Sequence, residues 1–257
     1  EFFTGARVLR LPARRGLIDA ERLARRLAEA PQGVHHGTLS VLSITAPNEF
    51  GLLYRPAEVA ALAEVAKAHG MALHMDGARF ANAVARLGCT PAELTWKAGV
   101  DVLSFGGTKG GCLMAEAVIL FDPARRDELA FRRKRAGQLI AKQRLVAAQF
   151  EAWLADDHWL TLATRANAMA DRLAAGLAGS PRARLAWAPQ ANEVFVTMPP
   201  TEAERLRAAG ATFHDWSIAA LDADDRPRAG DALWRFVTSF ATTEQEVDAL
   251  VDLLTAG

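Results

Sequence analysis

The sequence predicts an α/β fold with a mostly parallel sheet, and three segments in the first half of the chain carry this prediction. The run TLSVLSIT, residues 38–45, is rich in β-branched and apolar residues, as expected of a strand buried on both faces. An amphipathic helix follows over residues 56–69 and starts at a proline. Residues 71–75 form a second short apolar run. The order strand, helix, strand is typical of layered α/β folds with parallel strands.

The remaining segments extend this alternation. In the first half we expect helices at 16–28 (capped by Asp19), 78–87 and 91–98, and strands at 102–105 and 117–121. A long helical region then runs from residue 122 to about 179, with a break near Asp156 and Asp157. Beyond it we expect strands at 192–198, 211–214 and 234–239, and helices at 200–209 and 243–254. We therefore expect a large domain over residues 1–159 and a small C-terminal α/β domain over residues 160–257.

The composition excludes several functional classes. The 257 residues are 51% hydrophobic, and 30 basic residues balance 30 acidic ones, so we expect neither nucleic acid nor a membrane as partner. The apolar runs are too short to span a bilayer, and we expect no signal peptide. Cys89, Cys112 and the histidines show no metal-ligand spacing, so we expect no metal. Two unpaired cysteines favour a reducing, cytoplasmic location.

The most informative stretch is DVLSFGGTKGGCLMAEAVILF, residues 101–121. It presents Lys109 between two glycine pairs, on a loop that separates two apolar runs. Glycine lets a backbone pass close to a ligand. A lysine held there in a dry pocket can have a lowered pKa and can form a Schiff base. The alternative is a tight hairpin turn with a solvated lysine.

A second motif, LHMDGARF at residues 73–80, places Asp76 at the end of the preceding strand and Arg79 three residues later. Functional residues of parallel sheets gather at the carboxyl ends of strands, so we expect Asp76 and Lys109 at one edge. The alternative for Asp76 is an ion-paired acid that caps the next helix. His74 shares a strand face with Asp76, and we expect it to make a supporting hydrogen bond rather than to act in catalysis.

The pair of motifs resembles the pyridoxal-phosphate (PLP) enzymes of the aspartate-aminotransferase fold. The stretch from HMDGARF to SFGGTKGG is similar to the bacterial low-specificity L-threonine aldolases. VLSITAPNEFGLLYRPAEVAAL before it and RFVTSFATTEQEVDAL near the end extend this resemblance over essentially the whole chain. It implies a PLP-dependent transferase-like (fold type I) architecture, with a three-layer α/β/α large domain and a small C-terminal domain.

The resemblance also implies roles for individual residues. Asp76 pairs with the pyridine nitrogen of PLP, and Lys109 holds the cofactor as an imine. Thr108 contacts the phosphate, and Arg79 supports the Asp76 carboxylate or the cofactor. On the small domain, Arg235 matches the arginine that binds the substrate carboxylate; the alternative is a charge at a strand edge.

The resemblance also implies a role for a residue of the long helical region, at a boundary between subunits. Lys142 is expected to reach the cofactor phosphate, in a homodimer or homotetramer with shared sites. We interpret the basic run Arg132, Arg133, Lys134 and Arg135 as a solvated helix face. The base that deprotonates the β-hydroxyl group is not identifiable from the sequence.

The implied reaction is the PLP-dependent cleavage of L-threonine or L-allo-threonine to glycine and acetaldehyde. Two alternatives stay open: another lyase of this fold that acts at Cβ of a different amino acid, and a non-catalytic binding or assembly module. Members of the family carry a phosphate-binding helix N-terminus and a ring-stacking histidine ahead of the segment that matches EFFTGARV. We find neither here. We therefore expect a large domain that lacks its N-terminal part, and weak or no cofactor binding by this chain alone.

Overall fold

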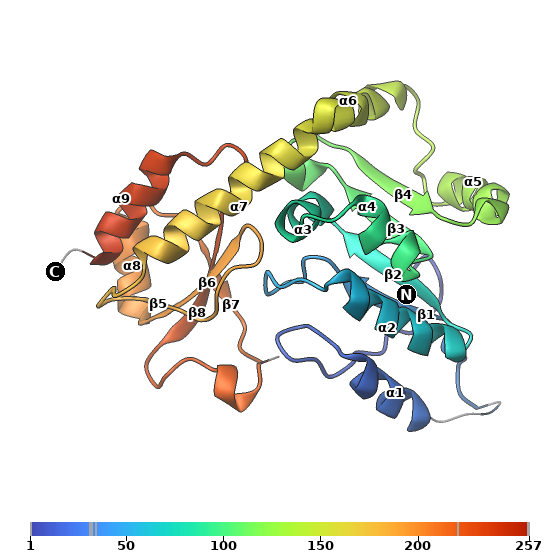
Figure 1. Ribbon diagram of the computed structural model, residues 1–257, viewed down its shortest axis with the longest axis horizontal. Helices are drawn as coiled ribbons and strands as arrows, with labels where there is room; N and C mark the ends of the chain where they lie inside the picture. Colours follow the sequence, from blue (N-terminus) through green and yellow to red (C-terminus); the bar gives the residue numbers. More distant parts are fainter. Residues whose placement is uncertain (1, 31–32, 34, 220, 256–257) are drawn as a thin grey trace.

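The computed structural model describes residues 2–30, 33, 35–219 and 221–255, which form two four-stranded sheets (Figure 1). The first sheet has the order β1-β2-β3-β4. Its strands are β1 (Val41–Thr45), β2 (Ala72–Gly77), β3 (Val102–Gly106) and β4 (Glu116–Leu120). β1, β2 and β3 are parallel, and β4 is antiparallel to β3. The predicted mostly parallel α/β sheet is therefore confirmed.

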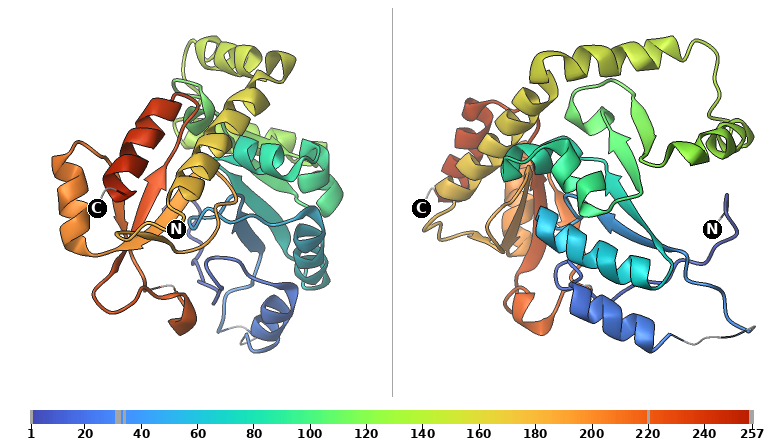
Figure 2. Two further views of the ribbon diagram at one scale, coloured as in Figure 1. Left: turned by 60° about the vertical axis from the view of Figure 1, so that its left-hand side comes forward. Right: turned by 45° about the vertical axis from the view of Figure 1, so that its right-hand side comes forward.

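Helices of the first half connect and cover this sheet. They are α1 (Ala20–Ala28), α2 (Pro56–Ala68), α3 (Phe80–Leu87) and α4 (Pro91–Leu94). Asp19 caps α1 as predicted, because its side chain accepts a hydrogen bond from the Arg22 N–H. α1 and α2 pack side by side (Figure 2). The helix expected over residues 91–98 is interrupted at Thr95, whose hydroxyl bonds back to the Pro91 carbonyl, and resumes as a short 3-10 turn, η1 (Trp96–Ala98).

The second half begins with the long helical region, which comprises three helices: α5 (Arg126–Arg135), α6 (Arg144–Leu154) and α7 (His158–Gly176). The predicted break lies between α6 and α7, where Asp156 and Asp157 take φ of 50° and 55°. Such left-handed conformations end a helix. In Figure 1, α7 runs from the side of the first sheet to the second sheet.

The second sheet has the order β5-β6-β8-β7 and is antiparallel throughout. Its strands are β5 (Arg184–Leu185), β6 (Glu193–Met198), β7 (His214–Trp216) and β8 (Ala232–Val237), and α8 (Pro200–Ala208) and α9 (Glu244–Thr255) complete this half. The strand expected at 211–214 was placed too early. The Ala211 N–H closes α8 on the Leu206 carbonyl, so pairing with β8 starts only at His214.

Buried apolar residues form one core around each sheet, and α7 contributes to both. Its first turns, with Trp159 and Ala163, belong to the core of the first sheet, whereas Met169 and Leu173 belong to that of the second. A third cluster joins the halves, because Phe50 packs there with residues of the second sheet and its loops. The expected domain boundary at residues 159 and 160 falls inside α7 and stays a prediction.

No helix in the described part of the chain is long and apolar enough to cross a membrane. Within the same residues, no group of three or more His, Cys, Asp or Glu side chains is arranged to hold a metal ion.

Candidate active site

Asp76 and Lys109 lie at the carboxyl ends of the neighbouring parallel strands β2 and β3. We call this edge the rim of the first sheet. Asp76 is aligned with Ser104 of β3 and with Thr45 of β1. Lys109 follows β3 on the 3-10 turn η2 (Thr108–Gly110). The Asp76 carboxylate is half-buried and accepts the Ala78 N–H at 3.0 Å. This bond forms the turn that delays α3 to Phe80, so Asp76 does not cap that helix.

The glycine pairs beside Lys109 are required by packing within the chain. A Cβ on Gly107 would lie 2.9 Å from Cys112 Sγ, and one on Gly110 would lie 2.6 Å from the Trp153 ring. Trp153 Nε1 also donates to the Gly110 carbonyl at 2.9 Å. The loop is therefore fastened to α6. Lys109 itself is exposed, and the dry pocket that we expected around it is not formed by the described residues.

Thr108 closes the same loop. Its hydroxyl accepts the Ala115 N–H at 3.2 Å and lies 3.4 Å from the Ala115 carbonyl, to which it donates. The side chain is exposed. Its phosphate contact stays a prediction, and the structure shows in addition that it ties η2 to the start of β4.

His74 connects three strands. Its Nδ1 lies 2.8 Å from Ser43 Oγ on β1, and its Nε2 lies 2.9 Å from Ser104 Oγ on β3. Burial lowers the pKa of His74, and the nearby Asp76 carboxylate opposes this shift. A neutral imidazole between two hydroxyls fits the supporting role that the sequence predicts.

Arg79 has a different ionic partner from the one that the sequence suggested. We expected it to support Asp76 or the cofactor, but its Nη1 lies 3.2 Å from Glu193 Oε1, on β6 of the second sheet. No ion pair to Asp76 is present among the described residues. The reason is position: Arg79 occupies the cap of α3 and its side chain extends toward the other half of the molecule. Its predicted contact with the cofactor stays a prediction.

Arg235 lies in the interior of the second sheet. β8 pairs with β6 on one side and β7 on the other, so the alternative of a charge at a strand edge is wrong. Its Nη1 lies 3.3 Å from Glu193 Oε1 and 3.5 Å from Glu49 Oε2. Its guanidinium carbon lies 4.0 Å from the centre of the Trp216 ring, so the group is also held from one face.

Sequence reasoning missed Glu193, onto which both arginines converge. Its side chain is fully buried. Burial raises the pKa of Glu193; Arg79 and Arg235 oppose the shift, Glu49 adds to it and Lys109 opposes it. A signal was present in the sequence, because the acid stands at the start of the strand EVFVTM, in which four of the other five residues are apolar.

Lys142 is not brought to this site within the chain. It is exposed, has a φ of 60° and precedes α6. The basic run on α5 is exposed as predicted, and Arg132 pairs there with Glu128.

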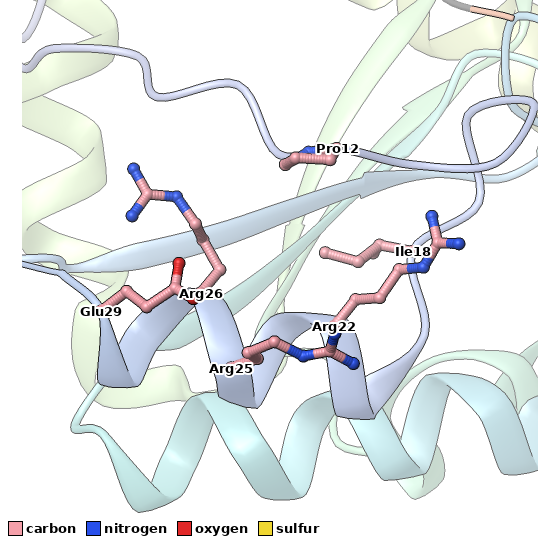
Figure 3. Close-up of a pocket in the computed structure, with 6 residues that line it drawn as sticks. All are labelled: Pro12, Ile18, Arg22, Arg25, Arg26 and Glu29. Carbon is pink, nitrogen blue, oxygen red and sulfur yellow. The ribbon is translucent and has the colours of Figure 1, made fainter. Parts of the chain in front are cut away.

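One hollow of the described surface, with a volume of about 280 Å³, lies elsewhere. Figure 3 shows it beside α1. Its lining residues are Pro12, Ile18, Arg22, Arg25, Arg26 and Glu29. None of the predicted site residues lines it, so it does not bear on the chemistry at Asp76 and Lys109.

The rim of the first sheet fits PLP by the chemistry of its groups. A primary amine and a carboxylate stand at one sheet edge, and each retains capacity for an outside partner. Among the described residues, the Asp76 carboxylate accepts one hydrogen bond, from the Ala78 N–H, and Lys109 has no ion pair. These groups suit the aldehyde and the ring nitrogen of PLP.

The fold defines the class of protein to which the chain belongs. The chain superposes on a structure of Leishmania major threonine aldolase with a TM-score of 0.87 and 27% identity, over 98% of this chain and 70% of that one. A putative L-allo-threonine aldolase from Listeria monocytogenes shares the fold at a TM-score of 0.70 and 17% identity, over 96% of this chain and 67% of that one. The architecture is that of PLP-dependent enzymes of fold type I.

The sequence comparisons then give the family. Residues 1–199 match the beta-eliminating lyase family. A low-specificity L-threonine aldolase from a Pseudomonas strain is 39% identical over 251 residues, which are 97% of this chain and 69% of that protein. Its counterpart in Pseudomonas aeruginosa is 42% identical over 215 residues, which are 83% of this chain and 62% of that protein. The chain belongs to this family of PLP-dependent lyases.

Proposed function

We propose that the protein cleaves L-threonine and L-allo-threonine to glycine and acetaldehyde, with PLP held covalently at Lys109. Membership in the threonine aldolase family supports the reaction. The single structural observation behind it is that β2 and β3 are parallel neighbours and bring Asp76 and Lys109 to one edge of the sheet.

The proposed chemistry divides between the cofactor and the chain. When bound, PLP supplies an electron sink for the pair released from the Cα–Cβ bond. Lys109 supplies the amine for covalent attachment. The Asp76 carboxylate holds the proton on the ring nitrogen, and its backbone bond to Ala78 fixes its orientation. The β-hydroxyl group loses a proton as acetaldehyde leaves, and Cα gains one to give glycine.

Substrate recognition is assigned to the second sheet. A guanidinium binds a carboxylate through two parallel hydrogen bonds, and Arg235 is fixed over Trp216 for this purpose. Arg79 and Thr108 are proposed as further cofactor contacts, and Lys142 as a phosphate contact in a shared site of a homodimer or homotetramer. A cytoplasmic location and the division into domains at residues 159 and 160 belong to the same proposal.

The test is aldehyde release by the purified, PLP-loaded protein from L-threonine, L-allo-threonine and phenylserine. We expect acetaldehyde and glycine in equal amounts from both threonine isomers, and no product with Lys109→Ala. If none of the three substrates releases an aldehyde, aldol cleavage is wrong, and elimination or another reaction at Cβ takes its place.

A further inference from the structure

A single buried carboxylate joins the two halves of the molecule. Glu193 begins β6, and one of its oxygens, Oε1, lies 3.2 Å from Arg79 Nη1 and 3.3 Å from Arg235 Nη1. Arg79 belongs to the first half of the chain, just after β2, whereas Arg235 lies on β8. One carboxylate oxygen therefore contacts two cations that come from different halves of the chain.

The loop over Glu193 is shaped to receive it. Gly51 has a φ of +69°, and a Cβ there would lie 3.0 Å from the Glu193 Cβ and 3.2 Å from the Glu193 carbonyl oxygen. Only glycine fits both the conformation and the space. The neighbouring Phe50 packs on Phe195 of the same strand. The backbone and the Cβ of Glu193 are thus closely packed against this loop.

Two buried polar atoms of this cluster have no hydrogen-bond partner among the described residues: Glu193 Oε2 and Arg235 Nε. Buried polar atoms are nearly always paired, so an unpaired one calls for a functional explanation. Here the unpaired atoms belong to the two side chains, one on β6 and one on β8, that form an ion pair with each other. The hydrogen-bonding capacity of the cluster is therefore not filled by its own side chains.

The charges of the cluster do not balance. The groups that act on Glu193 are Arg79, Arg235 and Lys109, which are cationic, and Glu49, which is anionic. Glu193, Arg79 and Arg235 are largely buried, but the side chain of Glu49 is 62% exposed and Lys109 is also exposed, so solvent screens both. Two largely buried cations thus share one buried carboxylate. An additional carboxylate would restore the balance, and an α-amino acid carries one.

We propose that Glu193 is a positioning residue, which fixes the Arg235 guanidinium against Arg79 so that Arg235 meets the α-carboxylate of the substrate. The inference rests on the proposed role of Arg235 in the reaction. Glu193 itself touches neither substrate nor cofactor. Its effect is to raise the affinity of the site for amines that carry a carboxylate, and to leave the affinity for amines without one unchanged.

The test compares glycine with methylamine, which is glycine without its carboxylate. Both are titrated against the PLP-loaded protein, and binding is followed by the cofactor absorbance. Glu193→Gln keeps the size of the side chain but removes its charge. We expect the Kd of glycine to rise about tenfold or more, as for a lost charge-assisted contact, and that of methylamine to stay within about twofold. With threonine, KM should rise while kcat stays within about twofold.

Two further variants separate positioning from a general loosening of the structure. Asp171→Asn breaks the pair with Arg86, in which two bonds of 2.9 Å also join the two halves, and it should leave both Kd values unchanged. Glu193→Asp keeps the charge and should recover part of the glycine affinity.

The proposal is overturned if Glu193→Gln binds glycine as the wild type does, or if glycine and methylamine weaken equally. A wild type that releases no aldehyde from threonine would defeat the proposed function alone. In that case the ratio of the glycine and methylamine affinities still decides the role of Glu193.

Discussion

The two charged regions of this molecule are built in opposite ways. At the rim, the carboxyl-end edge of the first sheet, Lys109 is exposed and Asp76 is half-buried, with a carboxylate that accepts one hydrogen bond among the described residues. At the boundary with the second sheet, Glu193 is fully buried and Arg235 is 14% exposed, and these two side chains pair with each other. The rim thus offers reactive groups to a partner from outside, whereas the boundary cluster holds its groups in place from within. The comparison indicates that the reacting groups lie at the rim, whereas the boundary cluster positions the group that binds the substrate.

The largest effect is expected at the rim. Lys109→Ala removes the amine that attaches the cofactor, and we expect kcat for threonine cleavage to fall at least about 10⁴-fold, the scale for loss of a covalent catalytic group. Lys97→Ala, which removes another exposed amine, is the matched control and should leave kcat unchanged. Equal activity of the two variants would move the covalent role away from Lys109.

Asp76→Asn should have the next largest effect. The amide oxygen still accepts the Ala78 N–H, so the fold is kept, but the charge that holds the ring proton is lost. We expect kcat to fall roughly 10²- to 10³-fold, as for removal of one preorganised electrostatic group. The control is Asp101→Asn, because Asp101 also accepts a backbone N–H, that of Leu73. A kcat for Asp76→Asn within twofold of wild type would exclude the proposed role.

At the boundary, the expected effects are on stability. Gly51 and Gly70 both have a φ of +69°, but a Cβ on Gly51 meets Glu193 whereas one on Gly70 meets nothing within 4 Å. Alanine at either position carries the cost of a left-handed conformation, about 1–3 kcal/mol. Gly51→Ala should lose more folding stability than Gly70→Ala. The difference between the denaturant midpoints of the two variants measures how tightly the loop packs around Glu193. Equal losses would show that the loop yields to the added methyl group.

The smallest effect concerns pH. Burial raises the pKa of Glu193 above its ordinary value of 4.5, so the folded protein holds this proton more tightly than the unfolded chain does. Wild type should therefore lose stability relative to Glu193→Gln as the pH rises above 4.5 through the folded pKa. Below 4.5 the difference should be constant. Unfolding by urea at several pH values measures it, and the opposite slope would show that the arginines outweigh burial.

Local patterns explain what could be predicted from the sequence. The cap at Asp19, the break at Asp156 and Asp157 and the alternation of strands and helices depend on residues near one another in the chain. The common edge of Asp76 and Lys109 was predicted from that alternation, because functional residues of parallel sheets gather at the carboxyl ends of strands. These features need no knowledge of the packing between distant segments.

Contacts between the two halves could not be predicted in this way. Arg79 meets Glu193 only because the second sheet folds back onto the first, so this ion pair could not be seen from the sequence around Arg79. The exposure of Lys109 depends on which segments cover the rim, and the glycines beside it pack on Cys112 and Trp153. An isolated acid in an apolar strand is the signal that would have pointed to Glu193.

The most direct test of the central claim is chemical. The PLP-loaded protein is reduced with borohydride and digested, and the peptides are mapped by mass spectrometry. We predict that the reduced cofactor is found on the peptide that contains Lys109 and that it is absent from Lys109→Ala. Cofactor fixed on another lysine, or on none, would contradict the account.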